Sequence, residues 1–524
     1  MESREYSFGD AHPAVRLVFS VLLIWSVHAH ASQSEQATKI ASLMASLHER
    51  GQFNGAVLVA ERGNIIYRGA YGKANFKTNA DLTPETPFCL ASVTKQFTAM
   101  AIMILAEQGR LSYDDPVSKY IRELSRTERT SKITVRHLLT HTSGIPDFGD
   151  LGIDDPHLTQ EGLIQALLQK ESVFSSAGRK YRYSNPGYIL LAIVVEKVYG
   201  QSFSDFLEQR IFRPLRMDNT FVFDTALKRN QQAAIGYNQF GQEDDVQATS
   251  TPGDGGIFST VDDLFKWDQA LNTDKLVPQS ALAVAFTPGK VEEGTSTYGF
   301  GWNVGDNDNG KYVWHSGSTA GFRAFIERQL AERVTVILLT NRGNSKRSEI
   351  NDAILNIVAG KPYLMPRMSG AEKLYGVIRE SGIQAALRLC DSLKTNLDYD
   401  LGESELNSLG YQLLYGDNRV QDAIAIFKLN TSAHPLSSNA YDSLAEAYRK
   451  SGADKLAISN YQNAVMLDSA NLHAVAMLKE MGQHPRNRFT LLLGVAGAVL
   501  LAMAATYAIR AWRASRRFGG RTAA

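Results

Sequence analysis

A serine and a lysine three residues apart, Ser92 and Lys95, have types and spacing suited to chemistry. Positions three apart on a helix lie on one face, so a helix that begins near Ser92 sets the lysine amine beside the serine hydroxyl. A serine is a poor nucleophile until a base takes its proton, and a lysine can be that base when its surroundings lower its pKa. Such a pair is common by chance, but here an apolar helical pattern from Phe97 to Ile104 follows it. The pair predicts nucleophilic catalysis by serine.

Two further short motifs carry polar groups of the kind that an acyl-transfer site needs. Tyr183 and Asn185 stand together in one segment, and His315, Gly317 and Ser318 stand in another, just before the last apolar strands. A tyrosine can pass a proton between nucleophile and leaving group, and an asparagine can hydrogen-bond a substrate amide. Taken singly, each motif fits a structural role better: an aromatic loop packed under a helix, or a buried structural histidine.

Together, the order S-x-x-K, Y-x-N, H-x-G and the gaps between these motifs resemble the serine β-lactamase and penicillin-binding-protein superfamily, specifically its class C-like branch. The resemblance covers about residues 37 to 360, and framework stretches at 137–145, 255–260 and 298–302 add to it. In the second stretch, Ser259 is expected to cap the helix that follows. The resemblance implies an α+β catalytic domain in which helices and a helical subdomain flank an antiparallel sheet. Neither an H-E-x-x-H nor a G-x-S-x-G motif is present, which argues against a zinc protease or an α/β-hydrolase.

The resemblance also implies a role for each site residue. Ser92 would attack a carbonyl and become acylated, and Lys95 and Tyr183 would share the acid–base work. Asn185 would orient the substrate. The backbone N–H groups of Ser92 and Ser318 would form an oxyanion hole that stabilises the developing negative charge.

The resemblance also implies that His315 and Gly317 bind the substrate. His315 stands where many β-lactamases carry lysine, and a histidine is a weaker, pH-dependent anchor for a carboxylate. In the family, this H-x-G form is closer to D-amino-acid peptidases, carboxypeptidases and related esterases than to efficient β-lactamases. The resemblance therefore implies acyl transfer on peptide or ester bonds, with no metal and no cofactor. A true class C-like β-lactamase is an alternative.

The elements that must position these residues can be read from apolar patterning. Apolar, β-branched runs at 55–60 and 64–68 predict a hairpin, and 334–340 predicts a buried strand with 321–329 as its partner. Helical spacing dominates between them. Strands at both ends with helices between predict one mixed sheet closed by the two ends of a single domain. A last helix at 348–358 would cover that sheet, so we place the catalytic domain at residues 32 to 362.

A different pattern begins after the catalytic domain. From about 371 to 480 the sequence has little strand signal, and Ala423-Ile424-x-x-Phe427 recurs as Ala457-Ile458-x-x-Tyr461, 34 positions later. This segment resembles tetratricopeptide repeats, in which small residues let paired helices approach and aromatic residues fill the grooves. Such repeats imply a possible protein partner, although no residue identifies it. An ordinary helical bundle is the alternative.

Both ends of the chain are apolar. The run at 17–27 precedes Ala29-His30-Ala31, the pattern of a secretory signal peptide over residues 1–31. The segment 489–509 carries no charge and would span about 31 Å as a helix, enough to cross a bilayer. Five arginines follow this segment and two precede it, which favours a cytoplasmic basic tail at 510–524. We therefore expect a single-pass protein of the cell membrane with an extracytoplasmic (periplasmic or extracellular) body. An uncleaved N-terminal anchor is the alternative.

The composition excludes several other classes. Lys and Arg total 55 and Asp and Glu total 54, a net charge of +1, whereas a nucleic-acid-binding protein usually has a basic domain. Cys89 and Cys390 are too few for a disulfide framework, and Cys89 is expected to be a small buried residue. We expect a small peptide or ester as substrate and no nucleic acid. The competing hypothesis is a catalytically weak penicillin-binding-type receptor or scaffold whose helical repeats recruit an envelope protein.

Overall fold

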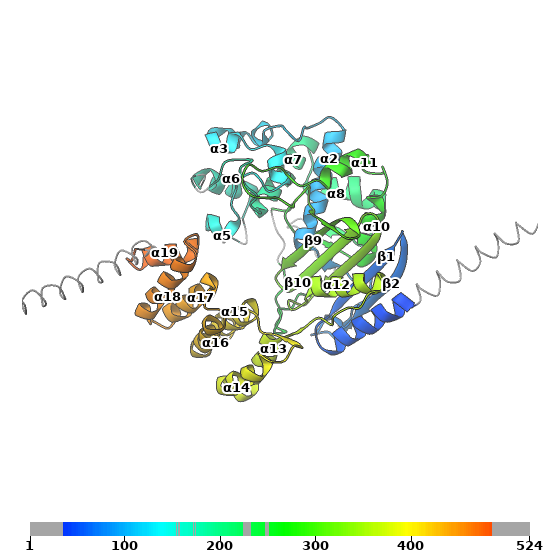
Figure 1. Ribbon diagram of the computed structural model, residues 1–524. Helices are drawn as coiled ribbons and strands as arrows, with labels where there is room; N and C mark the ends of the chain where they lie inside the picture. The colour runs from blue at the N-terminus through cyan, green and yellow to red at the C-terminus, as the bar shows by residue number, and fades with distance from the viewer. Residues whose placement is uncertain are drawn as a thin grey trace, which may run out of the picture. The chain divides into compact units, whose positions relative to one another are not determined.

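The computed structural model describes residues 35–484, apart from 154, 156, 157, 171, 173, 224–231 and 247–250. The chain divides into two compact units, Met1–Pro366 and Arg367–Ala524 (Figure 1). Among the residues that the structure describes, no helix combines the length and the apolar character needed to cross a bilayer. The predicted signal peptide at 1–31, spanning helix at 489–509 and basic tail at 510–524 lie outside the described residues.

Among the described residues, six strands form the main sheet, in the order β2-β1-β11-β10-β9-β8 (Figure 1). These strands are β1 (Gly55–Glu61), β2 (Asn64–Tyr71), β8 (Asn303–Asn307), β9 (Gly310–Thr319), β10 (Phe322–Gln329) and β11 (Val334–Thr340). The predicted hairpin and the predicted pair of C-terminal strands are confirmed. The mixed sheet is wrong: every neighbouring pair is antiparallel, because consecutive strands pair as hairpins and β11 meets β1 in the antiparallel sense.

Successive side chains of β1 enter two different apolar layers, because neighbours along a strand point to opposite faces of a sheet. Val57 packs in a cluster with side chains of α12 (Arg347–Val358) and of the helix at 35–49. Its neighbour Leu58 belongs to the larger core, together with side chains of α2 (Lys95–Glu107). Helices therefore cover both faces of the sheet, in agreement with the predicted α+β class.

The remaining elements of this unit lie between β2 and β8 in the sequence. The helices are α3 (Glu128–Ser131), α4 (Val135–Leu139), α5 (Phe148–Leu151), α6 (Gln160–Gln169), α7 (Asn185–Tyr199), α8 (Phe203–Leu207), α9 (Arg213–Leu215), α10 (Val261–Ala270) and α11 (Gln279–Ala285). Two short sheets accompany them: β3 (Lys73–Asn75) with β4 (Ala80–Asp81), and β5 (Phe88–Cys89), β7 (Ile257–Ser259) and β6 (Phe221–Val222) in the order β5-β7-β6.

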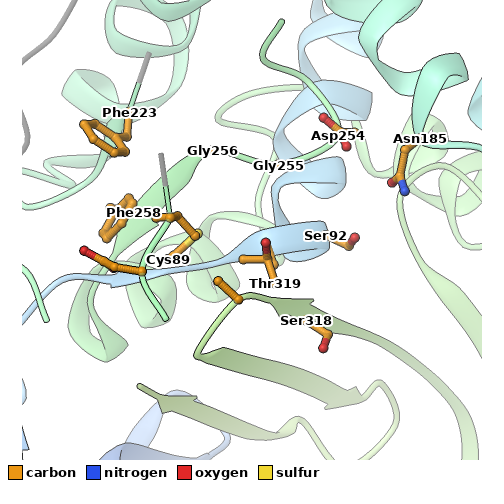
Figure 2. Close-up of a pocket in the computed structure, with 14 residues that line it drawn as sticks. Cys89, Ser92, Asn185, Phe223, Asp254, Gly255, Gly256, Phe258, Ser318 and Thr319 are labelled. Atoms are coloured by element: carbon orange, nitrogen blue, oxygen red, sulfur yellow. The ribbon is translucent and has the colours of Figure 1, made fainter. Parts of the chain in front are cut away.

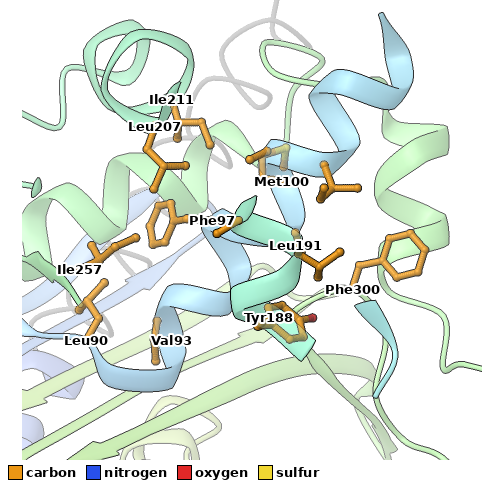
Figure 3. Close-up of a cluster of buried hydrophobic side chains, with 14 of the residues drawn as sticks. Leu90, Val93, Phe97, Met100, Tyr188, Leu191, Leu207, Ile211, Ile257 and Phe300 are labelled. Atoms are coloured by element: carbon orange, nitrogen blue, oxygen red, sulfur yellow. The ribbon is translucent and has the colours of Figure 1, made fainter. Parts of the chain in front are cut away.

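Helix α2 is buried on all its sides, which makes it a firm support for the residues at its start. Phe97 lies 4.5 Å from the Trp267 ring and 5.7 Å from the Phe212 ring, measured between centroids. Leu191 of α7 and Ile257 of β7 belong to the same core (Figure 3). Because so many elements meet on α2, its first turn has little freedom to move.

The start of α10 lies one residue later than the sequence suggested. Ser259 ends β7, and its hydroxyl is hydrogen-bonded to that of Thr220 at 2.7 Å. Thr260 caps the helix instead, since its Oγ1 accepts the backbone N–H of Asp263 at 3.1 Å. Two adjacent hydroxyl residues fit the capping pattern equally well, and strand pairing decides between them.

The second unit is built of helices, with one short parallel pair of strands, β12 (Met368–Ser369) and β13 (Tyr399–Asp400). Its helices are α13 (Gly370–Ser381), α14 (Ile383–Leu393), α15 (Glu403–Tyr411), α16 (Val420–Ala433), α17 (Ser438–Lys450), α18 (Asp454–Leu467) and α19 (Leu472–Glu480). Ala423 and Ala457, the small residues at equivalent repeat positions, are both fully buried, as are Phe427 and Tyr461. Their assignment to tetratricopeptide repeats stays a prediction.

Candidate active site

Ser92 lies in a tight turn between a strand and a buried helix. Strand β5 is held against β7, and Leu90 after it donates its N–H to Ile257 O at 2.8 Å. The chain then enters a 3-10 turn, Ala91–Thr94, that leads directly into α2. Ala91 has a φ of 47°, in the left-handed region that costs a non-glycine residue about 1–2 kcal/mol. This turn presents Ser92, which is partly exposed, to a cavity of about 430 Å³ (Figure 2).

Lys95 lies directly behind the Ser92 hydroxyl. Its side chain is fully buried, and Nζ donates to Ser92 Oγ at 3.1 Å, Asn185 Oδ1 at 2.7 Å and Asp254 O at 2.8 Å. Burial lowers the pKa of Lys95 to about 8, against the opposing attraction of the Asp254 and Asp147 carboxylates. A lysine with this pKa is neutral in a useful fraction of molecules near neutral pH, so it can accept the serine proton.

Tyr183 is placed on the other side of the nucleophile. Its ring centre lies 5.0 Å from Lys95 Nζ, and the Ser92 hydroxyl acts to lower the pKa of its phenol. Burial raises the pKa of Tyr183 well above its usual value, and the Asp254 and Asp147 carboxylates raise it further. The phenol is therefore neutral, so Tyr183 is suited to relaying a proton, while Lys95 is the better base.

Asn185 is held rigidly at the start of α7. Ser184 caps this helix by accepting the Gly187 N–H at 3.2 Å. The Asp147 carboxylate accepts both the backbone N–H and the side-chain Nδ2 of Asn185, each at 3.1 Å. With Oδ1 bonded to Lys95, the amide can turn in only one way. Figure 2 shows Asn185, Ser92 and Ser318 on different elements around the same cavity.

Gly317 lets β9 approach the nucleophile turn. A Cβ added at this position would lie 2.0 Å from Leu90 O and 3.2 Å from Ala91 Cβ, so a side chain cannot be accommodated. Strand β8 pairs with β9 only as far as Trp314, and the part of β9 that follows lies against this turn instead. The close approach brings Ser318 to the cavity beside Ser92. The oxyanion hole formed by the N–H groups of Ser92 and Ser318 stays a prediction.

We expect Gly317→Ala to reduce the hydrolytic rate at least about 100-fold, because the collision with a backbone carbonyl must shift β9 away from the nucleophile. Gly376→Ala is the matched control: Gly376 lies in α13 and a Cβ there meets nothing within 4 Å. The measurement is the kcat of each variant for a p-nitrophenyl ester. A Gly317→Ala enzyme with wild-type kcat would show that the close approach is dispensable.

His315 does not have the surroundings of a carboxylate anchor. Its side chain is buried, Nδ1 donates to Ser316 O at 2.7 Å, and Nε2 accepts from the Tyr298 hydroxyl at 2.7 Å. Burial, together with the nearby Lys95, lowers the pKa of His315 to about 3. The ring is therefore neutral with both nitrogens occupied, whereas the expected anchor needs a protonated ring and a free nitrogen. In this arrangement His315 holds the Tyr298 ring.

Several residues of the site have no signal of their own in the sequence. Asp147 orients Asn185, and Asp254 binds Lys95 through its backbone carbonyl. The only sequence signal near Asp254 is that glycines surround it, at positions 253, 255 and 256. Gly253 has a φ of 130°, and a Cβ there would meet Tyr188 O at 2.7 Å, so this glycine-rich segment passes where a side chain cannot. Among the described residues, no His, Cys, Asp or Glu side chains group as metal ligands would.

The pKa of Lys95 predicts the pH dependence of the reaction. Below pH 8 the amine is mostly protonated and cannot act as a base, so kcat/KM should rise about tenfold per pH unit and level off above about pH 9. The measurement is kcat/KM for a p-nitrophenyl ester from pH 5.5 to 10, corrected for spontaneous hydrolysis. A profile that is flat between pH 6 and 9 would contradict Lys95 as the base.

Comparison with known proteins agrees with this geometry. Residues 39–361 match the Beta-lactamase family. The chain is 33% identical to penicillin-binding protein 4* of Bacillus subtilis over 358 residues, 63% of this chain and 78% of that protein. The octameric penicillin-binding protein homologue from Pyrococcus abyssi has a TM-score of 0.56 at 28% identity, over 66% of this chain and 81% of the other. A class C β-lactamase shares the fold, with a TM-score of 0.55 at 23% identity over 63% of this chain and 96% of the other.

The matched residues 39–361 contain Ser92, Lys95 and Tyr183. Since the match also covers more than half of the sequence, the chain belongs to the beta-lactamase family, whose members are serine hydrolases related to penicillin-binding proteins.

Proposed function

We propose that this protein is a serine hydrolase that cleaves peptide, amide or ester bonds through an acyl-enzyme. The observation that carries the proposal is the fully buried Lys95 amine, 3.1 Å from the Ser92 hydroxyl and with a pKa lowered to about 8. A lysine with a purely structural role would not be expected to place its amine beside a serine hydroxyl that faces a cavity. The cavity in front of Ser92 gives a substrate access to this pair.

The proposed reaction has two halves. Ser92 Oγ attacks the substrate carbonyl carbon as its proton passes to Lys95 Nζ, and the N–H groups of Ser92 and Ser318 stabilise the oxyanion. Tyr183 then passes a proton to the leaving amine or alcohol as the bond to carbon breaks, which leaves an ester on Ser92. Water enters from the cavity, loses its proton to the same groups, and hydrolyses the ester to restore the free serine.

The substrates that we propose are D-amino-acid peptides or small esters. The named relatives among penicillin-binding proteins support acyl transfer on peptides. The neutral, fully engaged His315 favours substrates that need no charged anchor beside the scissile bond, small esters and amides among them.

A panel of substrates tests the proposal on the full chain in detergent. It contains p-nitrophenyl acetate, D-Ala-D-Ala peptides, D-alanine p-nitroanilide and nitrocefin, and intact-mass spectrometry follows the acyl adduct. Turnover of an ester or a D-peptide with an adduct on Ser92 supports the hydrolase. Rapid nitrocefin turnover points to the class C-like β-lactamase, whereas stable labelling without turnover of any substrate points to the penicillin-binding receptor or scaffold.

We also propose that the chain is anchored in the cell membrane by residues 489–509, with the catalytic unit outside the cytoplasm and the helices of 371–480 available to a protein partner. The apolar termini and the 34-residue spacing in the sequence support this arrangement. Protease added to intact spheroplasts should digest the catalytic unit and leave the basic tail protected.

A further inference from the structure

His141 lies beneath the catalytic tyrosine and contacts it on several sides. It follows α4 in the His-Thr-Ser-Gly stretch, and its side chain is fully buried. The His141 ring centre lies 4.2 Å from that of Tyr183 at an interplanar angle of 36°, so the two rings are in close but tilted contact. Tyr298 and Tyr188 enclose the same ring, at 4.5 and 4.9 Å.

The backbone on either side of Tyr183 is bonded to His141. Arg182 donates its N–H to the carbonyl of His141 at 2.8 Å, and Ser184 donates its N–H to Nδ1 at 3.1 Å. These bonds come from the residue before the tyrosine and the residue after it. They fix the peptide planes that direct the Tyr183 side chain, while the adjacent imidazole ring limits the movement of the phenol ring.

The conformation of His141 itself shows that this contact is specific. Its φ is 55°, in the left-handed region that few residues other than glycine adopt, although Asn, Asp and His adopt it more often than the rest. Because Nδ1 accepts a backbone N–H, the neutral ring carries its proton on Nε2, and Nε2 has no hydrogen-bond partner among the described residues. A residue kept only for core packing has no reason to carry a buried, unpaired N–H in a strained backbone.

We infer that His141 is a positioning residue for the reaction: through Nδ1, its carbonyl and its ring, it holds the Tyr183 side chain in its place near Lys95 and Ser92. The inference rests on the proposed function, since Tyr183 is useful there only if Ser92 is acylated. His141 is not among the residues that line the cavity, so it acts through Tyr183 and not on the substrate.

Three substitutions separate the parts of this contact. His141→Asn keeps an acceptor near the place of Nδ1 and tolerates a positive φ, His141→Phe keeps the ring without the acceptor, and His141→Ala removes both. His137→Ala is the matched control, because His137 lies in the same segment but bonds Thr134 at the start of α4. All are made in the full chain, and kcat is expressed per active site titrated with a fluorophosphonate.

We expect the Phe and Ala variants to lose about 30-fold or more in kcat per active site, because a catalytic group displaced by about 1 Å loses most of its effect. KM should change less than about threefold, and His141→Asn should stay within about fivefold of the wild type. Melting followed by circular dichroism shows which variants are folded. Wild-type kcat in the Ala or Phe variant, or an Asn variant as weak as the Ala variant, would overturn the inference.

A crystal structure of His141→Ala separates this inference from the proposed function. If the wild type neither turns over substrate nor labels on Ser92, the proposed function fails, and the position of Tyr183 still decides the inference. A Tyr183 ring displaced from Ser92 supports the role of His141, and a ring left in place refutes it. If the Ala variant does not crystallise, the Phe variant answers the same question.

Discussion

Ser92→Ala is expected to abolish covalent labelling by a fluorescent penicillin or a fluorophosphonate and to lower kcat/KM for an ester by roughly 10³-fold or more. Removing the nucleophile of a serine hydrolase leaves only the rate that binding and the oxyanion hole provide. The alanine should otherwise fit, since Ser92 is partly exposed beside the cavity and the hydroxyl is the only group removed. The measurements are gel fluorescence after probe treatment and steady-state turnover of p-nitrophenyl acetate.

The control for this experiment is Ser392→Ala. Ser392 is an exposed serine of α14 in the second unit, and its hydroxyl bonds only Leu389 O at 2.8 Å in the described structure. It should label and turn over like the wild type. Labelling that persists in Ser92→Ala would assign the nucleophile elsewhere, and Cys89, which also lines the cavity, is the first residue to test.

Lys95→Met is expected to lower kcat/KM by about 10²- to 10⁴-fold, the usual contribution of a general base. Methionine has nearly the length of lysine, so it fills the buried space behind Ser92 without offering a nitrogen. Labelling by a fluorophosphonate should become correspondingly slow but still reach Ser92. Lys132→Met is the control, because Lys132 is 68% exposed and its one ion pair in the described part of the chain is with the exposed Glu128. A Lys95→Met variant with more than a tenth of wild-type activity would refute the role of Lys95.

The same substitution should reveal how much the buried Lys95 destabilises the native state. Burial lowers the pKa of Lys95 from 10.5 to about 8, which corresponds to a penalty of roughly 3 kcal/mol on its charged form at neutral pH. The penalty is present in full below pH 8. It is relieved as the pH rises from 8 toward 10.5, because the buried amine loses its proton in the native state and no longer carries a charge that burial disfavours. Methionine removes this penalty but leaves Asn185 Oδ1 and Asp254 O without their donor, at a cost of about 1–3 kcal/mol each.

The free energy of unfolding of Lys95→Met at pH 7 should therefore lie within about 2 kcal/mol of the wild type, and the wild type should gain relative to the variant between pH 8 and 10. Urea denaturation at pH 7, 8.5 and 10 measures both quantities. A wild type that loses stability relative to the variant over this range would contradict the direction of the pKa shift.

The sequence predicts best those parts of the site that depend on local geometry. Ser92 and Lys95 are three residues apart, so a single turn of helix brings them together whatever surrounds them. The hairpin and the last strands were likewise predictable. In each case the apolar runs lie close together in the sequence, so the two strands of each pair find each other locally. The family resemblance then supplied Tyr183 and Asn185, which lie in a separate segment.

The rest of the site depends on contacts between distant segments, which a single sequence does not encode. Asp147 reaches Asn185 across 38 positions, and Lys95 finds the carbonyl of Asp254 across 159. The role predicted for His315 came from its motif and not from its neighbours. Only the fold shows that Tyr298 and Ser316 occupy both of its ring nitrogens. The capping of α10 by Thr260 was missed for the same reason, as strand pairing had taken Ser259.

The pairing of β1 with β11 has a consequence for how the protein is made. Gly55 lies opposite Thr340 in the sheet. Strand β1 is synthesised first, so it can pair with β11 only after almost the whole unit has been synthesised. Contacts so remote in sequence are slow to form and leave strand edges unprotected in the meantime. The hairpin of β1 and β2 must therefore stay unpaired on one side during synthesis. A chain truncated before Val334 should aggregate rather than fold, however complete its catalytic residues.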